Sequence, residues 1–212
     1  MSASLSTSFV DDLAAQAVLR RLYAAELAMS HDDRDDEDLD PFAHMGTGFS
    51  ISPRQGDFLH ALIRFARPSV VVEFATSLGF SSIYLASALK ANGSGRLYGS
   101  ELVPEKAAQA VENITAAGLA EHASILVGDA RKTLRDIPGP VDVALIDGWP
   151  NETGKSLSLE VLEILEPKLR PGAIIVNDNE EGDYLAHVRD PRNGYRSLSI
   201  PWKGSTELSL RL

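Results

Sequence analysis

The chain contains no cysteine among its 212 residues. This absence excludes a disulfide framework, a thiolate zinc site and a cysteine nucleophile. The sequence also has no run of about eighteen apolar residues that could cross a bilayer as a helix. Its first residues lack the basic start and the apolar core of a signal peptide. We therefore expect a cytoplasmic protein that does not span a membrane.

Basic charge is scarce as well, since 20 lysines and arginines face 30 aspartates and glutamates and the formal net charge is −10. Residues 31–40 hold seven acids and one arginine, which account for −6 of that charge. No part of the chain offers a basic stripe for phosphates, so a nucleic-acid partner is not expected. The acidic run is best interpreted as a solvated linker. A cation-binding lid is the alternative, although the run lacks the ligand spacing of an EF-hand loop.

The pattern of apolar and polar residues divides the chain in two. Residues 1–48 combine an amphipathic helix, predicted over Phe9–Ser30, with the acidic linker. We expect this part to act as a lid or as a dimer element, and the second role predicts a homodimer. Residues 49–212 form the predicted main domain, which is long enough for a proper hydrophobic core.

Strand and helix patterns alternate through the main domain after a first helix over Asp57–Ala66. The predicted strands are Val70–Ala75, Arg96–Glu101, Ser124–Val127, Val141–Asp147, Ala173–Asp178, Tyr195–Ile200 and Thr206–Arg211. Repeated strand–helix units favour a parallel sheet with right-handed crossovers. The fold prediction is α/β: a Rossmann-like three-layer sandwich with a mostly parallel seven-stranded sheet and an antiparallel C-terminal hairpin strand.

Acids lie at the ends of the first two predicted strands. Glu73 precedes a tight turn of small residues, and Glu101 ends the next strand. This pattern suits a nucleoside-type cofactor lying across the carboxyl ends of a parallel sheet. Glu101 can take both ribose hydroxyls, because a carboxylate only accepts hydrogen bonds and a diol donates two. Glu73 is costly at a valine-rich strand end unless a cofactor ammonium or the amides of the turn satisfy it.

Polar side chains also follow the fourth and fifth predicted strands. Neighbouring strands lie about 5 Å apart, so Asp147 can face Asp178 and Asn179. Two carboxylates and a carboxamide oxygen suit magnesium or a similar hard cation. The alternative is that Asp178 and Asn179 merely shape a turn.

Two further residues suit a bound base ring. Asp129, after the third strand, could accept from an exocyclic amine, cap a helix over Arg131–Ile137, or do both. Trp149 could stack on the same ring, or serve as an ordinary core or lid aromatic.

Together these motifs resemble class I S-adenosylmethionine-dependent methyltransferases, and more narrowly the catechol O-methyltransferase family and its small bacterial relatives. The resemblance covers residues 49–212. It rests on an ordered set of stretches: Gln55–Gly56, Pro68–Glu73, Ser77–Ser81, Glu101–Glu105, Gly128–Ala130, Ile146–Trp149, Leu169–Ala173 and Asp178–Asn179.

The resemblance implies S-adenosyl-L-methionine as cofactor and Mg²⁺ or a similar divalent cation held by Asp147, Asp178 and Asn179. It places Glu73 and Ser81 at the methionine end of the cofactor and Glu101 at its ribose. The implied cofactor-binding set is Ile51, Glu73, Ala75, Ser77, Gly79, Ser81, Glu101, Leu102, Gly128, Asp129, Ala130, Asp147 and Trp149.

The chain departs from this family at two positions. Family members often carry glycine where Ala75 stands, so the cofactor turn is expected to be tighter. Many carry a lysine general base where this chain has Pro150. Lys155 could replace that base, although a plain surface lysine is favoured. His44 has a suitable pKa range, and acidification of the substrate hydroxyl by the metal is the third possibility.

The resemblance implies a magnesium-assisted O-methyltransferase that acts on a small catechol-like or natural-product hydroxyl, with Asp147, Lys155 and His44 as candidate catalytic residues. A tRNA-modifying methyltransferase of the same fold is one alternative, and the lack of a basic face counts against it. A cofactor-binding protein without turnover is another, which Pro150 keeps open. A nicotinamide-dependent oxidoreductase ranks low, because the turn lacks the Gly-x-Gly-x-x-Gly spacing.

Overall fold

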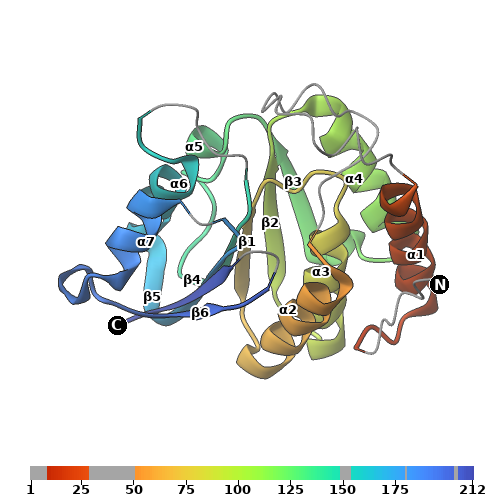
Figure 1. The fold of residues 1–212 in the computed structure, drawn as a ribbon. Helices are drawn as coiled ribbons and strands as arrows, with labels where there is room; N and C mark the ends of the chain where they lie inside the picture. Colours follow the sequence, from red (N-terminus) through yellow and green to blue (C-terminus); the bar gives the residue numbers. More distant parts are fainter. Residues whose placement is uncertain (1–8, 29–50, 149–153, 180, 203–204) are drawn as a thin grey trace.

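The computed structural model describes residues 9–28, 51–148, 154–179, 181–202 and 205–212. His44, Trp149, Pro150 and the acidic run lie outside these residues. A seven-stranded sheet lies between two layers of helices (Figure 1). The α-helices are α1 (Leu13–Leu27), α2 (Pro53–Ala66), α3 (Phe80–Asn92), α4 (Pro104–Ala116), α5 (Ala130–Thr133), α6 (Leu157–Leu165) and α7 (Gly182–Arg189). The strands are β1 (Val70–Phe74), β2 (Arg96–Glu101), β3 (Ala123–Val127), β4 (Val141–Ile146), β5 (Leu169–Asn177), β6 (Tyr195–Ile200) and β7 (Thr206–Arg211).

The strand order is β3-β2-β1-β4-β5-β7-β6. Strands β1 to β5 pair in parallel, whereas β7 pairs antiparallel with both β5 and β6. The predicted mostly parallel sheet with its antiparallel C-terminal hairpin is therefore confirmed. All five parallel strands end at the same edge, so the polar residues that follow β1, β2, β4 and β5 gather there.

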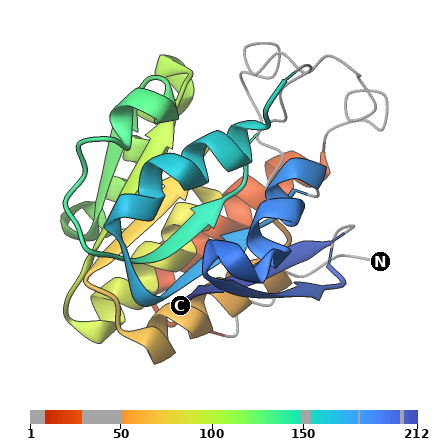
Figure 2. The same cartoon turned by 90° about the vertical axis from the view of Figure 1, so that its left-hand side faces the viewer.

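Alternation of side chains along the strands gives the sheet two apolar faces. Val71, Val143 and Leu145 belong to the core shared with α1 to α4, whereas Val72 and Ile146 belong to the core shared with α5 to α7. Figure 2 shows α6 and α7 lying over the second face. Both faces of β4 are buried along its full length, which explains its uninterrupted run of mostly apolar residues.

The first residues of α1 and α2 differ from the predicted ones, because capping residues set where these helices begin. Helix α2 begins at Pro53, because Ser52 and Gln55 form a capping box and proline suits the first helical turn. Helix α1 begins at Leu13, and Asp12 caps it by accepting hydrogen bonds from two backbone amides. Helix α7 was not predicted, and it is the next helix along the chain after β5.

The described part of the N-terminal segment packs on the main domain. Val18 and Leu19 of α1 are buried in the core that α2 and α3 also share. At the N-terminal end of α1, Lys90 of α3 forms an ion pair with Asp12. The role of residues 1–48 as a lid or dimer element stays a prediction, as does the cytoplasmic location. Among the residues described, no helix is both long and apolar enough to cross a membrane.

Candidate functional site

The turn between β1 and α3 has an unusual backbone. Ala75, Ser77 and Gly79 all have positive φ, at 66°, 51° and 85°. For a residue with a Cβ this left-handed region costs about 1–2 kcal/mol. The carbonyl of Ser100 on β2 holds the turn by accepting from the amides of Ala75 and Thr76. Such strain persists where the surroundings enforce it, and it is common at ligand sites.

Glu73 lies on β1, just before this turn, and is completely buried. Its carboxylate accepts hydrogen bonds from the hydroxyls of Thr76, Ser81 and Ser82. Burial raises the pKa of Glu73, and these hydroxyl donors oppose the rise. Its partners in the structure are therefore side-chain hydroxyls rather than the turn amides considered from the sequence. A cofactor ammonium beside Glu73 stays a prediction.

Gly99 leaves room for this buried acid. It pairs with Glu73 across β1 and β2. A Cβ at Gly99 would lie 2.3 Å from Oγ1 of Thr76 and 3.1 Å from Oε2 of Glu73. The first distance is far below any normal contact, so a side chain here would displace the hydroxyl that supports Glu73.

Glu101 fastens the turn from the end of β2. Its Oε2 accepts from the backbone N–H of Ser77 at 2.7 Å, and its Oε1 accepts from that of Val103 at 2.9 Å. A carboxylate has about four lone-pair positions, so these two amides leave acceptor capacity for a diol. Lys106, which is buried in the first turn of α4, has its pKa lowered by burial, and Glu101 opposes that shift. Leu102 is partly exposed beside Glu101.

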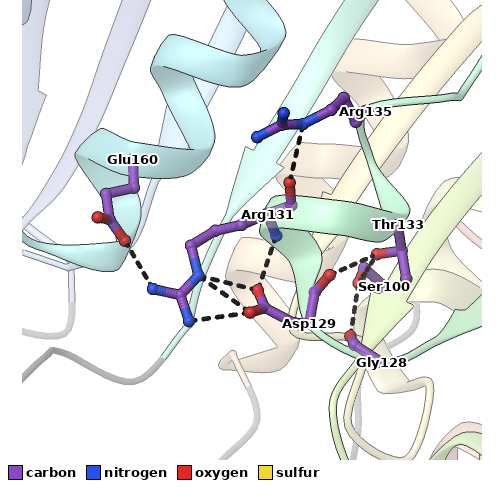
Figure 3. A network of polar contacts seen from close by, with 7 residues as sticks. All are labelled: Ser100, Gly128, Asp129, Arg131, Thr133, Arg135 and Glu160. Atoms are coloured by element: carbon purple, nitrogen blue, oxygen red, sulfur yellow. Dashed lines mark hydrogen bonds and ion pairs between the residues drawn. The ribbon is translucent and has the colours of Figure 1, made fainter.

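The loop after β3 carries the predicted helix cap. Asp129 caps α5 by accepting from the backbone N–H of Arg131, and its carboxylate also pairs with the Arg131 guanidinium (Figure 3). This pairing lowers the pKa of Asp129. The helix that follows covers Ala130–Thr133 and is shorter than predicted. Capping is thus observed, and contact of Asp129 with a base ring stays a prediction.

The predicted metal ligands follow the ends of two neighbouring strands, β4 and β5. The last paired residues of β4 and β5 are Ile146 and Asn177, so Asp147 and Asp178 follow them at the same level of the sheet. The amide nitrogen of Asn179 donates to the carbonyl of Gly148 at 2.5 Å, which brings this side chain to the end of β4. Two carboxylates and an amide oxygen fit a hard cation that keeps several waters. Within the part of the chain that the structure describes, no group of three or more His, Cys, Asp or Glu side chains gathers as a metal site.

Two residues outside the predicted site, Gln55 and Thr206, hold Asp178 in place. Gln55 donates to Oδ1 of Asp178 at 2.5 Å, and the hydroxyl of Thr206 donates to the same atom at 2.6 Å. All three side chains are buried. They border a small pocket whose other lining residues are Ile51, Phe58, Leu59, Leu145, Val176 and Trp202. The capping-box spacing of Ser52 and Gln55 was visible in the sequence, but it gave no sign of a contact with β5.

Of the two candidate general bases, Lys155 lies within the described residues. Lys155 donates to both carboxylate oxygens of Glu163, at 2.7 and 2.8 Å, and this contact raises its pKa. A lysine with a raised pKa is a poor base near neutral pH. His44 and Trp149 lie outside the described residues.

Comparison with known proteins gives one family match. The family model described as "Methyltransferase domain" matches residues 72–179, about half of the chain. A catechol O-methyltransferase from Niastella koreensis is 36% identical over 134 residues, which are 61% of this chain and 58% of that protein. A catechol O-methyltransferase from Mycobacterium tuberculosis is 34% identical over 144 residues, which are 66% of this chain and 62% of that protein. The chain thus spans less than two thirds of the length of these two relatives.

Solved structures agree with the fold. Cofactor-bound Rv0187 from MTB has a TM-score of 0.68 and 25% identity, with 95% of this chain and 90% of that chain covered. The O-methyltransferase TomG from Streptomyces achromogenes, in complex with SAM, has a TM-score of 0.67 and 23% identity, with the same coverage.

Proposed function

This chain belongs to the methyltransferase-domain family and is of the catechol O-methyltransferase-like, class I type, and from this premise we propose that it transfers a methyl group from S-adenosyl-L-methionine to a hydroxyl of a small molecule. The family and the fold are those expected from the sequence. The methyl acceptor we propose is a compound with adjacent oxygens, such as a catechol or a natural-product diol.

The main support for this proposal is the pair of acids around the strained turn. Glu101 is fixed by two backbone amides and keeps acceptor capacity for two ribose hydroxyls. The carboxyl oxygens of Glu73, which accept from three hydroxyls, would also accept from the ammonium of the methionine part. The bound cofactor would supply a methyl group on a positively charged sulfur, which leaves as a neutral thioether once the acceptor oxygen takes the methyl.

The acceptor hydroxyl has to lose its proton before it can attack. A divalent cation at Asp147, Asp178 and Asn179 would lower the pKa of that hydroxyl and hold it in line with the methyl group. Gln55 and Thr206 would orient the Asp178 carboxylate, because both donate to its Oδ1. We favour this route over a lysine base, because the pairing of Lys155 with Glu163 raises the pKa of the lysine.

Two measurements test the proposal. Calorimetry should detect binding of S-adenosylhomocysteine, and a diol library should show methyl transfer that magnesium supports and EDTA removes. Asp178→Ala should abolish the metal-dependent activity and leave the affinity for S-adenosylhomocysteine nearly intact. Asp190→Ala is the matched control, since Asp190 pairs with the exposed Arg192 outside the site.

Three results would contradict the proposal in different parts. Retained activity in Asp178→Ala would reject the metal role. Methylation of bulk tRNA would replace the substrate class. Tight cofactor binding without turnover on any diol would indicate a binding protein rather than an enzyme.

A further inference from the structure

Asp129 engages Arg131 through both carboxylate oxygens. Oδ1 accepts from the backbone N–H at 2.9 Å and from Nε at 3.0 Å, and Oδ2 accepts from Nη2 at 2.9 Å and from Nε at 3.1 Å (Figure 3). Three N–H donors therefore share about four lone-pair positions. The carboxylate keeps capacity for one more donor, and its side chain is 26% exposed.

The same guanidinium reaches across to α6. Nη1 of Arg131 forms an ion pair with Oε2 of Glu160 at 3.1 Å. Asp129, Arg131 and Glu160 thus form a chain from the loop after β3 to the helix after β4 (Figure 3). Ion pairs this exposed contribute little to folding stability. Their clearer effect is geometric, because the planar fork of an arginine fixes the plane of a carboxylate.

Separate contacts hold the backbone of the loop. The hydroxyls of Ser100 and Thr133 lie 2.6 Å apart, and that of Ser100 donates to the carbonyl of Gly128 at 3.3 Å. The hydroxyl of Thr133 is also 3.3 Å from the carbonyl of Asp129, to which it donates. These contacts do not involve the guanidinium. The place of the loop and the direction of the Asp129 carboxylate therefore depend on different residues.

We propose that Arg131 is a positioning residue for adenine recognition, which directs the remaining acceptor position of Asp129 toward the exocyclic amine of the cofactor. This inference rests on the proposed function and specifies which residues recognise the adenine of the cofactor. Glu160 holds the guanidinium from the side of α6. The loop backbone, fixed by Ser100 and Thr133, keeps its place whether or not Arg131 is present.

The test compares two ligands by calorimetry: S-adenosylhomocysteine and the analogue in which hydrogen replaces the 6-amino group. The unaltered protein should prefer S-adenosylhomocysteine by about tenfold, since a hydrogen bond to a charged acceptor is lost with the amine. In Arg131→Ala the preference should fall to about threefold or less, with binding of the analogue unchanged. Arg131→Lys should be intermediate, because lysine keeps the charge without the fork.

Arg135→Ala is the matched control. Arg135 donates to the carbonyl of Arg131 at 3.3 Å rather than to the Asp129 carboxylate, so this variant should keep the full preference. Equal weakening of both ligands in Arg131→Ala would indicate a purely structural role and overturn the inference. An unchanged preference in that variant, or no preference in the unaltered protein, would overturn it as well. If the unaltered protein does not bind S-adenosylhomocysteine at all, the proposed function fails together with this inference.

Discussion

Glu73 links the chemistry of the site to the stability of the fold. Burial raises its pKa above the ordinary value of 4.5, and the hydroxyls of Ser82, Ser81 and Thr76 only oppose that rise. In the folded state the protonated form is therefore favoured more than in the unfolded chain. The stability that this group contributes is fully present below pH 4.5 and is lost as the pH rises through the raised pKa.

Replacing this acid by its amide should remove that dependence. In Glu73→Gln the side chain keeps nearly the same shape and carries no charge. Its carbonyl oxygen can still accept from Thr76 and Ser82, which share Oε2, while the amide nitrogen would take the place of Oε1 and donate to Ser81. We expect the free energy of unfolding to decline less steeply in the variant as the pH rises above 4.5. Urea unfolding at a series of pH values measures this, with Glu163→Gln as the control on an exposed acid. Identical pH profiles for Glu73→Gln and the unaltered protein would contradict the prediction.

Among the helices and strands, α2, β5 and β7 meet at Asp178. The capping box that starts α2 also orients Gln55, and β7 starts with Thr206. Both side chains bind the same oxygen of Asp178. The proposed metal ligand therefore depends on the positions of a helix and a strand that carry no ligand themselves.

Thr206→Val tests this dependence because valine has nearly the same shape but no hydroxyl. Losing a donor to a buried carboxylate should lower the free energy of unfolding by about 1–3 kcal/mol. It should also weaken Mn²⁺ binding by about tenfold or more, as is usual for residues that orient a metal ligand. Urea unfolding and calorimetry with Mn²⁺ measure the two effects. Thr206→Ser should restore both, and a variant with unaltered Mn²⁺ affinity would show that Thr206 does not orient the ligand.

The order of the helices and strands was predictable because it depends on local patterns. Each parallel strand is an apolar run followed by a helical pattern, and every predicted strand is present within a few residues. Helix α7 was missed because it is short and buries only Tyr184 and Val188. Eight residues with two buried apolar positions give too weak a helical periodicity to predict a helix from the sequence.

The placement of the site residues was predictable where they are close in sequence or follow adjacent parallel strands, as Asp147 and Asp178 do. Glu73 and Ser81 belong to one strand–turn–helix unit, and the contact between them is observed. Gln55 and Thr206 lie 123 and 28 residues from Asp178. No short-range pattern reports such contacts, since they arise only when α2 and β7 pack against β5. Hydroxyl groups rather than backbone amides contact Glu73 largely because Ser81 and Ser82 lie in the first turn of α3, which packs beside it.

The hydrophobic core on one face of the sheet includes residues of the first helix, α1. Leu19 of α1 is fully buried among residues of α2 and α3, so it packs as a core residue does. A segment that only covered a site from outside would not bury a leucine so completely. The fold and the N-terminal helix should therefore unfold together.

Leu19→Ala should lower the free energy of unfolding by about 2–5 kcal/mol, because it leaves a cavity in that core. Leu13→Ala on the same helix should change it by less than about 0.5 kcal/mol, since Leu13 is 78% exposed. Urea unfolding followed by circular dichroism measures both. Similar small effects of the two substitutions would mean that α1 contributes little to the stability of the fold.

The close packing against Gly99 has a practical consequence for mapping this protein by mutagenesis. An acid can stay inside the sheet here because the opposite residue offers no atoms beyond its backbone. Alanine scanning removes side chains and passes over glycine, so it would leave this position untested. A scan that instead adds a methyl group at each glycine would identify Gly99 as a position on which the buried contacts of Glu73 and Thr76 depend.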